Sequence, residues 1–438
     1  MDADIIVTGR TADSALALAP LVHEFNWSLE KDWDKLSSGS LAGHLIECGG
    51  QATGGLYTDW EDVDGYENLG FPVAQVSENG DILVTKPEKT GGLLNRNTVS
   101  EQMLYEIGDP SSYILPDVVC DFTQVQMKDT PEGVLVTGAK GRPATDSFKV
   151  CSTYLDGFKA TAVAVVAGGR AAGKARKTAD AIMKRTNGLL KKLGLEEFSR
   201  THISIIGAED VFGKNRQTNI SAREAVIWMS VAHSNPEAIN VWAREIASSG
   251  TGMTPGLCGM VGGRPKPIPC LKLYSFLYPK EKLPGTVQIG EKKENFKAFV
   301  PSNQSCERTV ETKSKENLTL KQGSNTFRLE ELAFSRSGDK GNSCNIGVIA
   351  RDPAYLPYIK DRLTEERVFE YFEHLFGPNG KVTRFDLPGI DALNFLLEDV
   401  LDGGGIASMR PDPLGKAFGQ ILLDIPLNNM PSLEEILS

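Results

Sequence analysis

The clearest periodic pattern along the chain is helical. Apolar residues recur every three or four positions from Ala171 to Leu193, and Gly194 then ends the segment. Similar patterns predict helices over 15–25, 221–234 and 236–249. We interpret the many Lys and Arg residues of the longest helix as its solvated face.

Alternation of apolar and polar residues predicts strands elsewhere. Segments 71–76 and 81–87 flank Asn79-Gly80, the dipeptide most typical of a tight hairpin turn. Further strand-like patterns lie at 3–9, 134–137, 148–154, 158–166, 202–207 and 271–278.

A polar, charged stretch at 302–326 divides the chain and is typical of a flexible linker. The mixture of strands and helices before it predicts a larger α/β domain over 1–301. The unit after it, 327–427, has predicted strands at 345–350, 381–387 and 421–425, and predicted helices at 353–376 and 390–401. This order favours a small α+β domain of ferredoxin-like type, followed by a tail at 428–438. The predicted fold class is therefore α/β. Because the chain opens directly on a core-like strand, we expect the larger domain to be partial at its N-terminus.

Composition narrows the class of protein. The 438 residues are 40% hydrophobic with a net charge of −10, which argues against nucleic-acid or anionic-membrane partners. No apolar run approaches the roughly 20 residues of a membrane span. The 7 cysteines form no CxxC pair, which argues against a zinc site or disulfide framework. We expect a cytoplasmic protein; a mitochondrial location would require a transit peptide, and the acidic start does not resemble one.

The first candidate site lies where the strand at 3–9 would meet the following helix. A strand, a polar loop and a helix N-terminus in that order suit an anion, and Thr8, Arg10 and Asp13 lie at that point. Asp13 is equally explained as the helix N-cap.

A second candidate is the segment that contains His44, Glu47 and Cys48. Their spacing places all three on one face of a helix, where they offer a base, an acid and a nucleophile. Gln51 follows in a glycine-rich turn. The structural alternative is a buried His44 bonded to Glu47. Metal-assisted chemistry with Asp117 as a third ligand is a further hypothesis, although no metal signature is present.

The third candidate is the densest in functional groups. Gly338 and Gly341 punctuate a polar segment and allow backbone N–H groups to face an anion. The side chains available there for a ligand are Ser335, Arg336, Ser337, Asp339, Lys340 and Asn342. The alternative is an ordinary hairpin whose polar residues satisfy one another.

Lys86, Arg264 and Asp117 are further candidates for ligand binding. Lys86 precedes a loop of small residues, and Arg264 lies in a run rich in glycine and proline. Asp117 and Asp121 would point the same way from an extended chain, although such pairs are often turn or cap residues.

With these motifs in view, the chain resembles the acyclic terpene utilisation (AtuA-type) family over nearly its whole length. The segments that carry the resemblance are 3–15, 43–55, 58–62, 85–87, 105–110, 116–122 and 335–347. The resemblance implies a large α/β region joined to a ferredoxin-like C-terminal domain. The family normally has further α/β sequence before the position of Ala3, so we expect this chain to lack part of that region.

The family is associated with the breakdown of acyclic terpenes such as citronellol and geraniol through branched acyl-CoA intermediates. The resemblance therefore implies an enzyme, or a component of one, that acts on a branched acyl-CoA in a hydratase or lyase step. The alternative is a non-catalytic subunit that assembles with acyl-CoA carboxylase or hydratase partners. We expect a homo-oligomer, no cofactor beyond the CoA moiety of the substrate, and a ligand held between the C-terminal domain and the larger domain.

Overall fold

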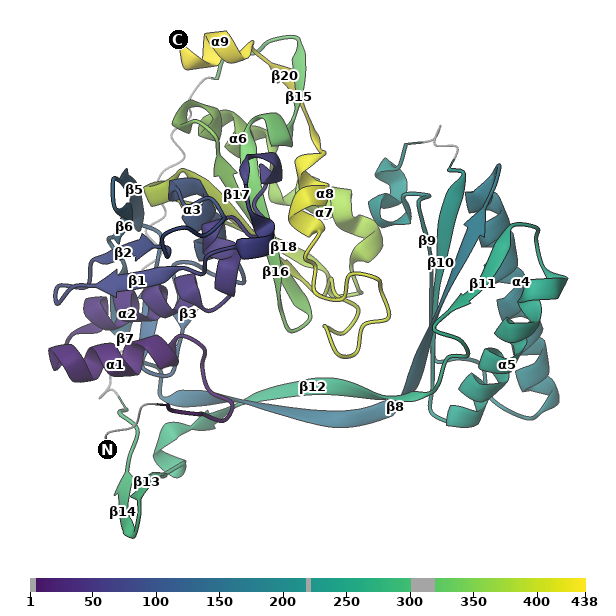
Figure 1. Ribbon diagram of the computed structural model, residues 1–438, viewed down its shortest axis with the longest axis horizontal. Coiled ribbons are helices and arrows are strands. Elements are labelled where there is room, and N and C mark those ends of the chain that lie inside the picture. The colour runs from purple at the N-terminus through teal and green to yellow at the C-terminus, as the bar shows by residue number, and fades with distance from the viewer. Residues whose placement is uncertain (1–4, 218–221, 301–319) are drawn as a thin grey trace.

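The computed structural model describes residues 5–217, 222–300 and 320–438. It has an N-terminal body (15–143), a distal lobe joined to that body by a long two-stranded ribbon, and a C-terminal domain (325–437) packed on the body (Figure 1). Residues 1–301, predicted as one domain, thus contribute to both the body and the distal lobe.

The N-terminal body is built on two small antiparallel sheets. One has the order β1-β2-β6-β5, with β1 at Val73–Val76, β2 at Ile82–Thr85, β5 at Gln126–Thr130 and β6 at Gly133–Thr137. The other has the order β3-β4-β7, with β3 at Tyr113–Ile114, β4 at Val118–Asp121 and β7 at Lys140–Pro143. The hairpin predicted around Asn79-Gly80 is confirmed, and Gly80 has the positive φ of 94° that its turn requires.

Three helices complete the body: α1 (Ala15–Phe25), α2 (Trp33–Ile46) and α3 (Arg96–Leu104). Helix α3 is fixed at its start by its cap. Its N-cap Asn95 accepts hydrogen bonds from two backbone N–H groups, and Thr98 completes a capping box. Residues Thr98 to Leu104 of this helix are all buried, and the helix lies against the C-terminal domain.

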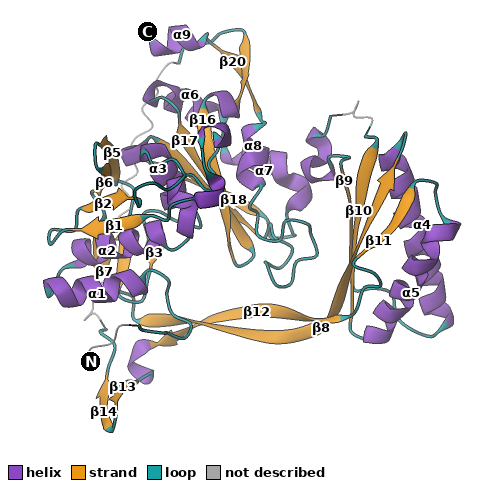
Figure 2. Ribbon diagram, in the orientation of Figure 1, coloured by secondary structure: helices purple, strands orange, loops and turns teal. Residues whose placement is uncertain are grey.

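The ribbon consists of the first half of β8 (Ser147–Ala167) paired with β12 (Ile268–Pro279). Within the described part of the chain, residues 147–156 of β8 pair with β12 alone. Figure 2 shows the two strands crossing open space before β8 enters the distal sheet. At the root of the ribbon, buried Lys280 donates from Nζ to the carbonyl of Pro116, 2.7 Å away.

The distal lobe has ferredoxin-like topology. Its elements follow the order β8, α4 (Ala171–Lys192), β9 (Arg200–Ile206), β10 (Glu224–His233), α5 (Pro236–Gly252) and β11 (Leu257–Val261). The antiparallel strands are arranged as β11-β8-β10-β9, so two split β-α-β units interleave. Helices α4 and α5 cover one face, where small alanines and Trp242 form the core (Figure 2).

The C-terminal domain has the same strand arrangement with a permuted chain order. Its sheet is β16 (Ala333–Lys340), β17 (Ser343–Ala350), β19 (Ala392–Glu398) and β18 (Lys381–Leu387), in that spatial order. The edge strand β16 comes first in the chain, whereas the corresponding edge strand of the distal lobe, β11, comes last. The predicted ferredoxin-like domain is therefore confirmed, as a circular permutant.

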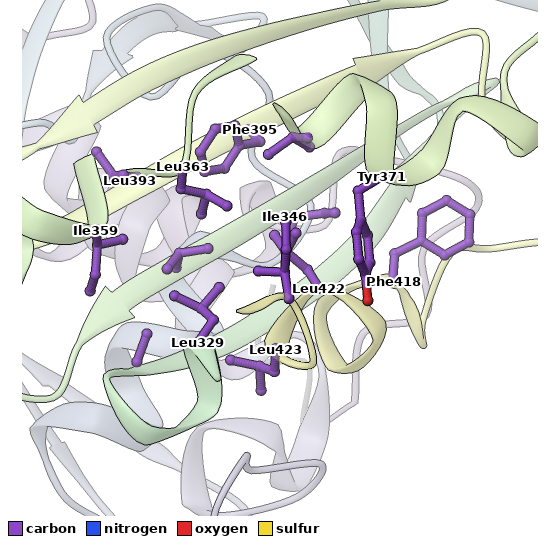
Figure 3. Packing of buried hydrophobic residues seen from close by; sticks show 14 of the residues in the cluster. Leu329, Ile346, Ile359, Leu363, Tyr371, Leu393, Phe395, Phe418, Leu422 and Leu423 are labelled. Carbon is purple, nitrogen blue, oxygen red and sulfur yellow. The ribbon is translucent and has the colours of Figure 1, made fainter. Parts of the chain in front are cut away.

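Helices α6 (Leu356–Arg362), α7 (Glu365–Phe372) and α8 (Phe418–Leu423) cover one face of this sheet. Figure 3 shows Leu422 of α8 near the strand residue Ile346, Phe418 beside Tyr371 of α7, and Leu423 beside Leu329. The pair β15 (Asn325–Arg328) and β20 (Pro426–Met430) and helix α9 (Leu433–Leu437) add residues to this core, among them Leu427 and Met430. A separate hairpin is formed by β13 (Gly285–Ile289) and β14 (Lys292–Phe296).

Four predicted elements were wrong. The helices predicted over 221–234 and 390–401 contain β10 and β19, which are central strands buried on both faces. Such strands lack alternation, and a continuous apolar run does not distinguish them from helices. The strand predicted at 421–425 is occupied by the end of α8. The described residues 5–9 of the strand predicted at 3–9 are irregular, and Ile5, Ile6 and Val7 are exposed.

The distal lobe also contacts the C-terminal domain directly. Trp228 and Ser230 of β10 both donate to the carbonyl of Met409, at 2.8 and 3.0 Å. A second contact joins His374 to the carbonyl of Val211 at 2.7 Å. The lobe is therefore held by the ribbon and by the C-terminal domain. Among the described residues, no helix is both long and apolar enough to cross a membrane.

The contact between α3 and the C-terminal sheet predicts the effect of two glycine substitutions. A Cβ at Gly347 would lie 2.7 Å from Leu104, whereas a Cβ at Gly188 in α4 would meet nothing within 4 Å. We expect Gly347→Ala to lower the free energy of unfolding by about 1–3 kcal/mol through overpacking. Gly188→Ala, the control, should raise it by about 0.4–1 kcal/mol because the unfolded chain loses freedom. Denaturant unfolding measures both, and equal effects would contradict the tight packing.

Candidate functional site

The candidate site lies where strand β16 crosses the ends of α2 and α3. Because side chains alternate along a strand, β16 sends Arg336 and Lys340 toward the body, with Gly338 between them. Ser335 and Ser337 point the other way, toward α8. The polar segment thus forms strand β16 and the turn into β17, which is the hairpin of the alternative interpretation, and the candidate residues of the strand divide between two faces of the sheet.

Arg336 joins the C-terminal domain to the body through a buried ion pair. Its guanidinium donates to Glu101 of α3 at 2.8 and 3.1 Å, to the Gln51 side chain at 2.6 Å and to the carbonyl of Gly55 at 3.0 Å. The side chains of Arg336 and Glu101 are 4% and 0% exposed. A buried charge is tolerated only when it is paired and hydrogen-bonded, as both charges are here. The ion pair therefore fixes how the two domains meet.

A second ion pair supports the same contact. Arg351 binds both carboxylate oxygens of Asp59 at 2.6 Å, and its guanidinium lies 4.2 Å from the centre of the Phe334 ring. The hydrogen bonds to Asp59 raise the pKa of Arg351 above its usual value, so this charge is permanent.

The remaining hydroxyl and amide candidates bond within the C-terminal domain. Ser335 donates to the carbonyl of Gly347 and Ser337 to that of Gly415. Asn342 donates to Asp399 at 2.7 Å, and its side-chain oxygen accepts from the N–H of Gly403. These contacts order the loop between β19 and α8. As ligand contacts, Ser335, Ser337 and Asn342 stay predictions.

Beyond Arg336, two lysines converge on one carboxylate. Lys340 of β16 and Lys416, which precedes α8, each place Nζ 3.5 Å from the side chain of Glu106. Glu106 follows α3 and is held in the left-handed region at φ 60°. Such a conformation is costly for a residue with a Cβ and often marks a functional site. We call these three residues the junction cluster.

Burial shifts the pKa values of two residues of the junction cluster. Loss of solvent raises the pKa of Glu106, although Lys340 opposes the shift. Burial likewise lowers the pKa of Lys416. Both shifts bring proton exchange closer to neutral pH, which suits general acid–base chemistry.

The lysines are also held by aromatic rings. Lys340 Nζ lies 5.9 Å from the centre of the Tyr113 ring, and Lys416 Nζ lies 4.2 Å from that of Tyr105. Rings at these distances attract a cation through their negative faces. The half-buried Asp339 lies on the same strand, and burial together with the charge of Glu106 raises its pKa.

The structure brings the predicted His44, Glu47 and Cys48 to the edge of this cluster. His44 Nε2 lies 3.1 Å from the carbonyl of Met103, and Nδ1 lies 3.1 Å from Glu47. A carbonyl only accepts, so the ring donates from Nε2 to Met103. The bond predicted as the structural alternative is therefore present. Burial raises the pKa of the Cys48 thiol, which keeps it protonated and a poor nucleophile.

Other predicted residues lie on elements away from the junction cluster. Thr8 and Arg10 belong to the exposed irregular segment, and Asp13 precedes α1 without capping it. Lys86 donates to the carbonyl of Thr90 at 2.8 Å and so holds its own loop. Arg264 lies in the exposed turn between β11 and β12.

Asp117 interacts with Lys280 at the root of the ribbon, and burial raises the pKa of its carboxyl group. Asp121 accepts from Thr123 two residues later, in the turn predicted as the alternative. Across the described parts of the chain, no three His, Cys, Asp or Glu side chains converge on a metal position. The hypothesis of a metal held by His44, Glu47 and Asp117 therefore finds no support.

Glu101, Glu106, Tyr113 and Lys416 were missed as site residues. Glu106 lies within segment 105–110, which carries part of the family resemblance, and Tyr113 lies just beyond it. This segment was the available signal for both residues. Lys416 lies in a loop with no motif of its own, and only the fold brings it to Glu106.

The protein thus belongs to the class in which an α/β body carries a ferredoxin-like domain, with charged residues where the two meet. Comparison with family models then identifies the family of the chain. The model of the acyclic terpene utilisation family protein AtuA matches residues 1–289, and that of the AtuA ferredoxin-like domain matches residues 327–428. The chain therefore belongs to the AtuA family. Neither the curated proteins nor the solved structures give a match to it.

The buried ion pair predicts a large loss of stability when one partner is removed. Glu101→Gln leaves Arg336 charged in a dry site and should cost about 3–5 kcal/mol of unfolding free energy. The double variant Glu101→Leu with Arg336→Met removes both charges and should recover most of that loss. Asp34→Asn, which breaks an exposed pair with Lys140, is the control and should cost less than about 1 kcal/mol. A double variant no more stable than Glu101→Gln would contradict this account.

Proposed function

We propose that this protein acts on a branched CoA thioester formed during the breakdown of acyclic terpenes, and that it catalyses a hydratase or lyase step at the junction cluster. Membership of the AtuA family supports the substrate class. The observation that carries the reaction type is the carboxylate of Glu106, held between Lys340 and Lys416 from the other domain. No cofactor enters the proposal, and CoA is part of the substrate.

Glu106 acts first as a base and then as an acid in this mechanism. It takes a proton from water while the water oxygen bonds to the β-carbon of an unsaturated thioester. The electrons of the double bond move toward the thioester carbonyl, where a lysine stabilises the negative charge that develops. Glu106 then returns its proton to the α-carbon, which completes the addition of water. The same steps in reverse eliminate water.

The surroundings of Glu106 support this role. Gly338 allows close approach, because a Cβ there would lie 2.5 Å from the Tyr105 ring and 2.8 Å from Glu106. The side chain of Glu106 is 24% exposed, and those of Lys340 and Lys416 are 44% and 40% exposed, so a substrate has access to all three. Contributions from both domains agree with the predicted position of the ligand between them.

The second candidate is a non-catalytic subunit that assembles with an acyl-CoA carboxylase or hydratase. The observation in its favour is that the lysines already neutralise Glu106, as in ion-pair networks whose role is structural. The two candidates differ in whether the purified protein alone turns over a thioester.

Glu106→Gln separates catalysis from binding. The amide keeps the shape of the side chain but cannot exchange the proton, so turnover should fall by about 10²–10⁴-fold. Affinity for a branched enoyl-CoA thioester, measured by calorimetry, should change only a few-fold. Glu398→Gln, at an exposed carboxylate of the C-terminal domain, is the control. If the wild-type protein binds these thioesters but does not hydrate them, the subunit role replaces the catalytic one; if it binds none, the substrate class is also wrong.

The pKa shifts predict a bell-shaped dependence of turnover on pH. Activity should rise as Glu106 ionises, at a pH above the usual glutamate range because its pKa is raised. It should fall as Lys416 loses its charge, below the usual lysine range because its pKa is lowered. Lys416→Arg should move the alkaline limb to higher pH and leave the acid limb in place. A profile whose alkaline limb is unchanged in Lys416→Arg would show that Lys416 does not set it.

A further inference from the structure

The ribbon leaves large apolar side chains in water on both of its faces. Opposed residues of an antiparallel pair share a face, so the pairing of β8 with β12 assigns each side chain. One face carries Leu155, Leu273 and Leu277, and the other carries Tyr154, Tyr274 and Phe276. All six are exposed, from 40% for Phe276 to 72% for Leu277.

The ribbon exposes more large apolar side chains than a ribbon that stays surrounded by water would have. An isolated two-stranded hairpin is marginal in water and needs further strands or a packed face for stability. Alternating strands normally keep one polar face. Apolar residues on both faces indicate a surface that is covered in the working protein.

The exposed apolar side chains supply part of the area that a dimer needs. A large apolar or aromatic side chain has about 150–250 Å² of surface, so the six leave on the order of 600 Å² in water, about half of it on each face. A stable protein interface buries about 800 Å² on each partner. The backbone and half-buried neighbours such as Val150 supply the remainder.

The charges of the ribbon also permit two copies to approach. The chain carries a net charge of −10. Residues 147–156 and 271–279 carry only Lys149, Asp156 and Lys272, and the last two pair with each other at 2.6 Å. Like copies of this segment therefore meet with little repulsion, which elsewhere on an acidic protein would oppose self-association.

We propose that the ribbon is a dimerisation arm and that its occupant is the ribbon of a second copy of this chain. The second copy presents the same apolar surface and, among the described residues, the same unpaired outer edge of β12, so a two-fold axis matches each surface with itself. Two ribbons meeting in this way bury on both copies the apolar side chains of the face that they share.

Sedimentation of the purified full chain over a range of concentrations tests the proposal. The wild type should associate to a dimer. Tyr274→Asp and Leu277→Asp change opposite faces of the ribbon. The variant whose face is buried in the dimer should raise the dissociation constant at least about tenfold, as centrally placed interface residues do. Leu193→Asp, an equally exposed leucine beyond α4, is the control and should leave the dimer intact. All three side chains are exposed in one copy, so the melting temperature of the monomer should not fall.

Two native cysteines provide an independent measurement. Cys151 lies on the ribbon opposite Ser275, whereas Cys258 lies on β11, and both are exposed free thiols. Thiol labelling resolved by mass spectrometry should slow at Cys151 as protein concentration rises and stay constant at Cys258. A wild type that is monomeric throughout overturns the proposal. So does a dimer that neither ribbon substitution weakens, or a monomer that binds lipid vesicles through the same residues.

Discussion

The buried pairing of Arg336 with Glu101 is the interaction on which the arrangement of this molecule depends. It joins the second strand of the C-terminal domain to a helix of the N-terminal body, across 235 positions of sequence. Neither charge has another full counter-ion among the contacts described, so each domain, taken alone, would carry a charge without its ion-pair partner. The pair therefore makes the two domains interdependent. The distance between Lys340 and Glu106 follows from it, since Lys340 lies four residues further along the strand that Arg336 anchors.

Local signals in the sequence predicted the parts of the fold that depend on neighbouring residues. The hairpin at Asn79-Gly80, the long helix α4 and strand β18 at Lys381–Leu387 were all predicted from turn residues or periodicity. Strands β10 and β19 were taken for helices because both of their faces are buried, which removes the alternation that identifies a strand. The permuted strand order of the C-terminal sheet could not be predicted from the sequence either, because no local pattern indicates which strands are neighbours.

The candidate site shows the same division. His44, Glu47 and Cys48 were found because a helix places them together within one turn. Arg336 was singled out as a ligand contact, yet the structure engages it with Glu101, a partner that spacing could not indicate. The convergence of Lys416 on Glu106 depends on the fold alone, because the two residues come from different domains and Lys416 lies in no recognisable motif.

The ribbon begins and ends at the same place in the body. Its first residue pairs with its last, Ser147 with Pro279, so the chain leaves the body and returns to it at neighbouring positions. The segment between them is an insertion in the topological sense, and the path of the chain through the body would close without it. The ferredoxin-like lobe at its far end can thus differ in sequence, except where it contacts the C-terminal domain, without altering the packing that surrounds Glu106.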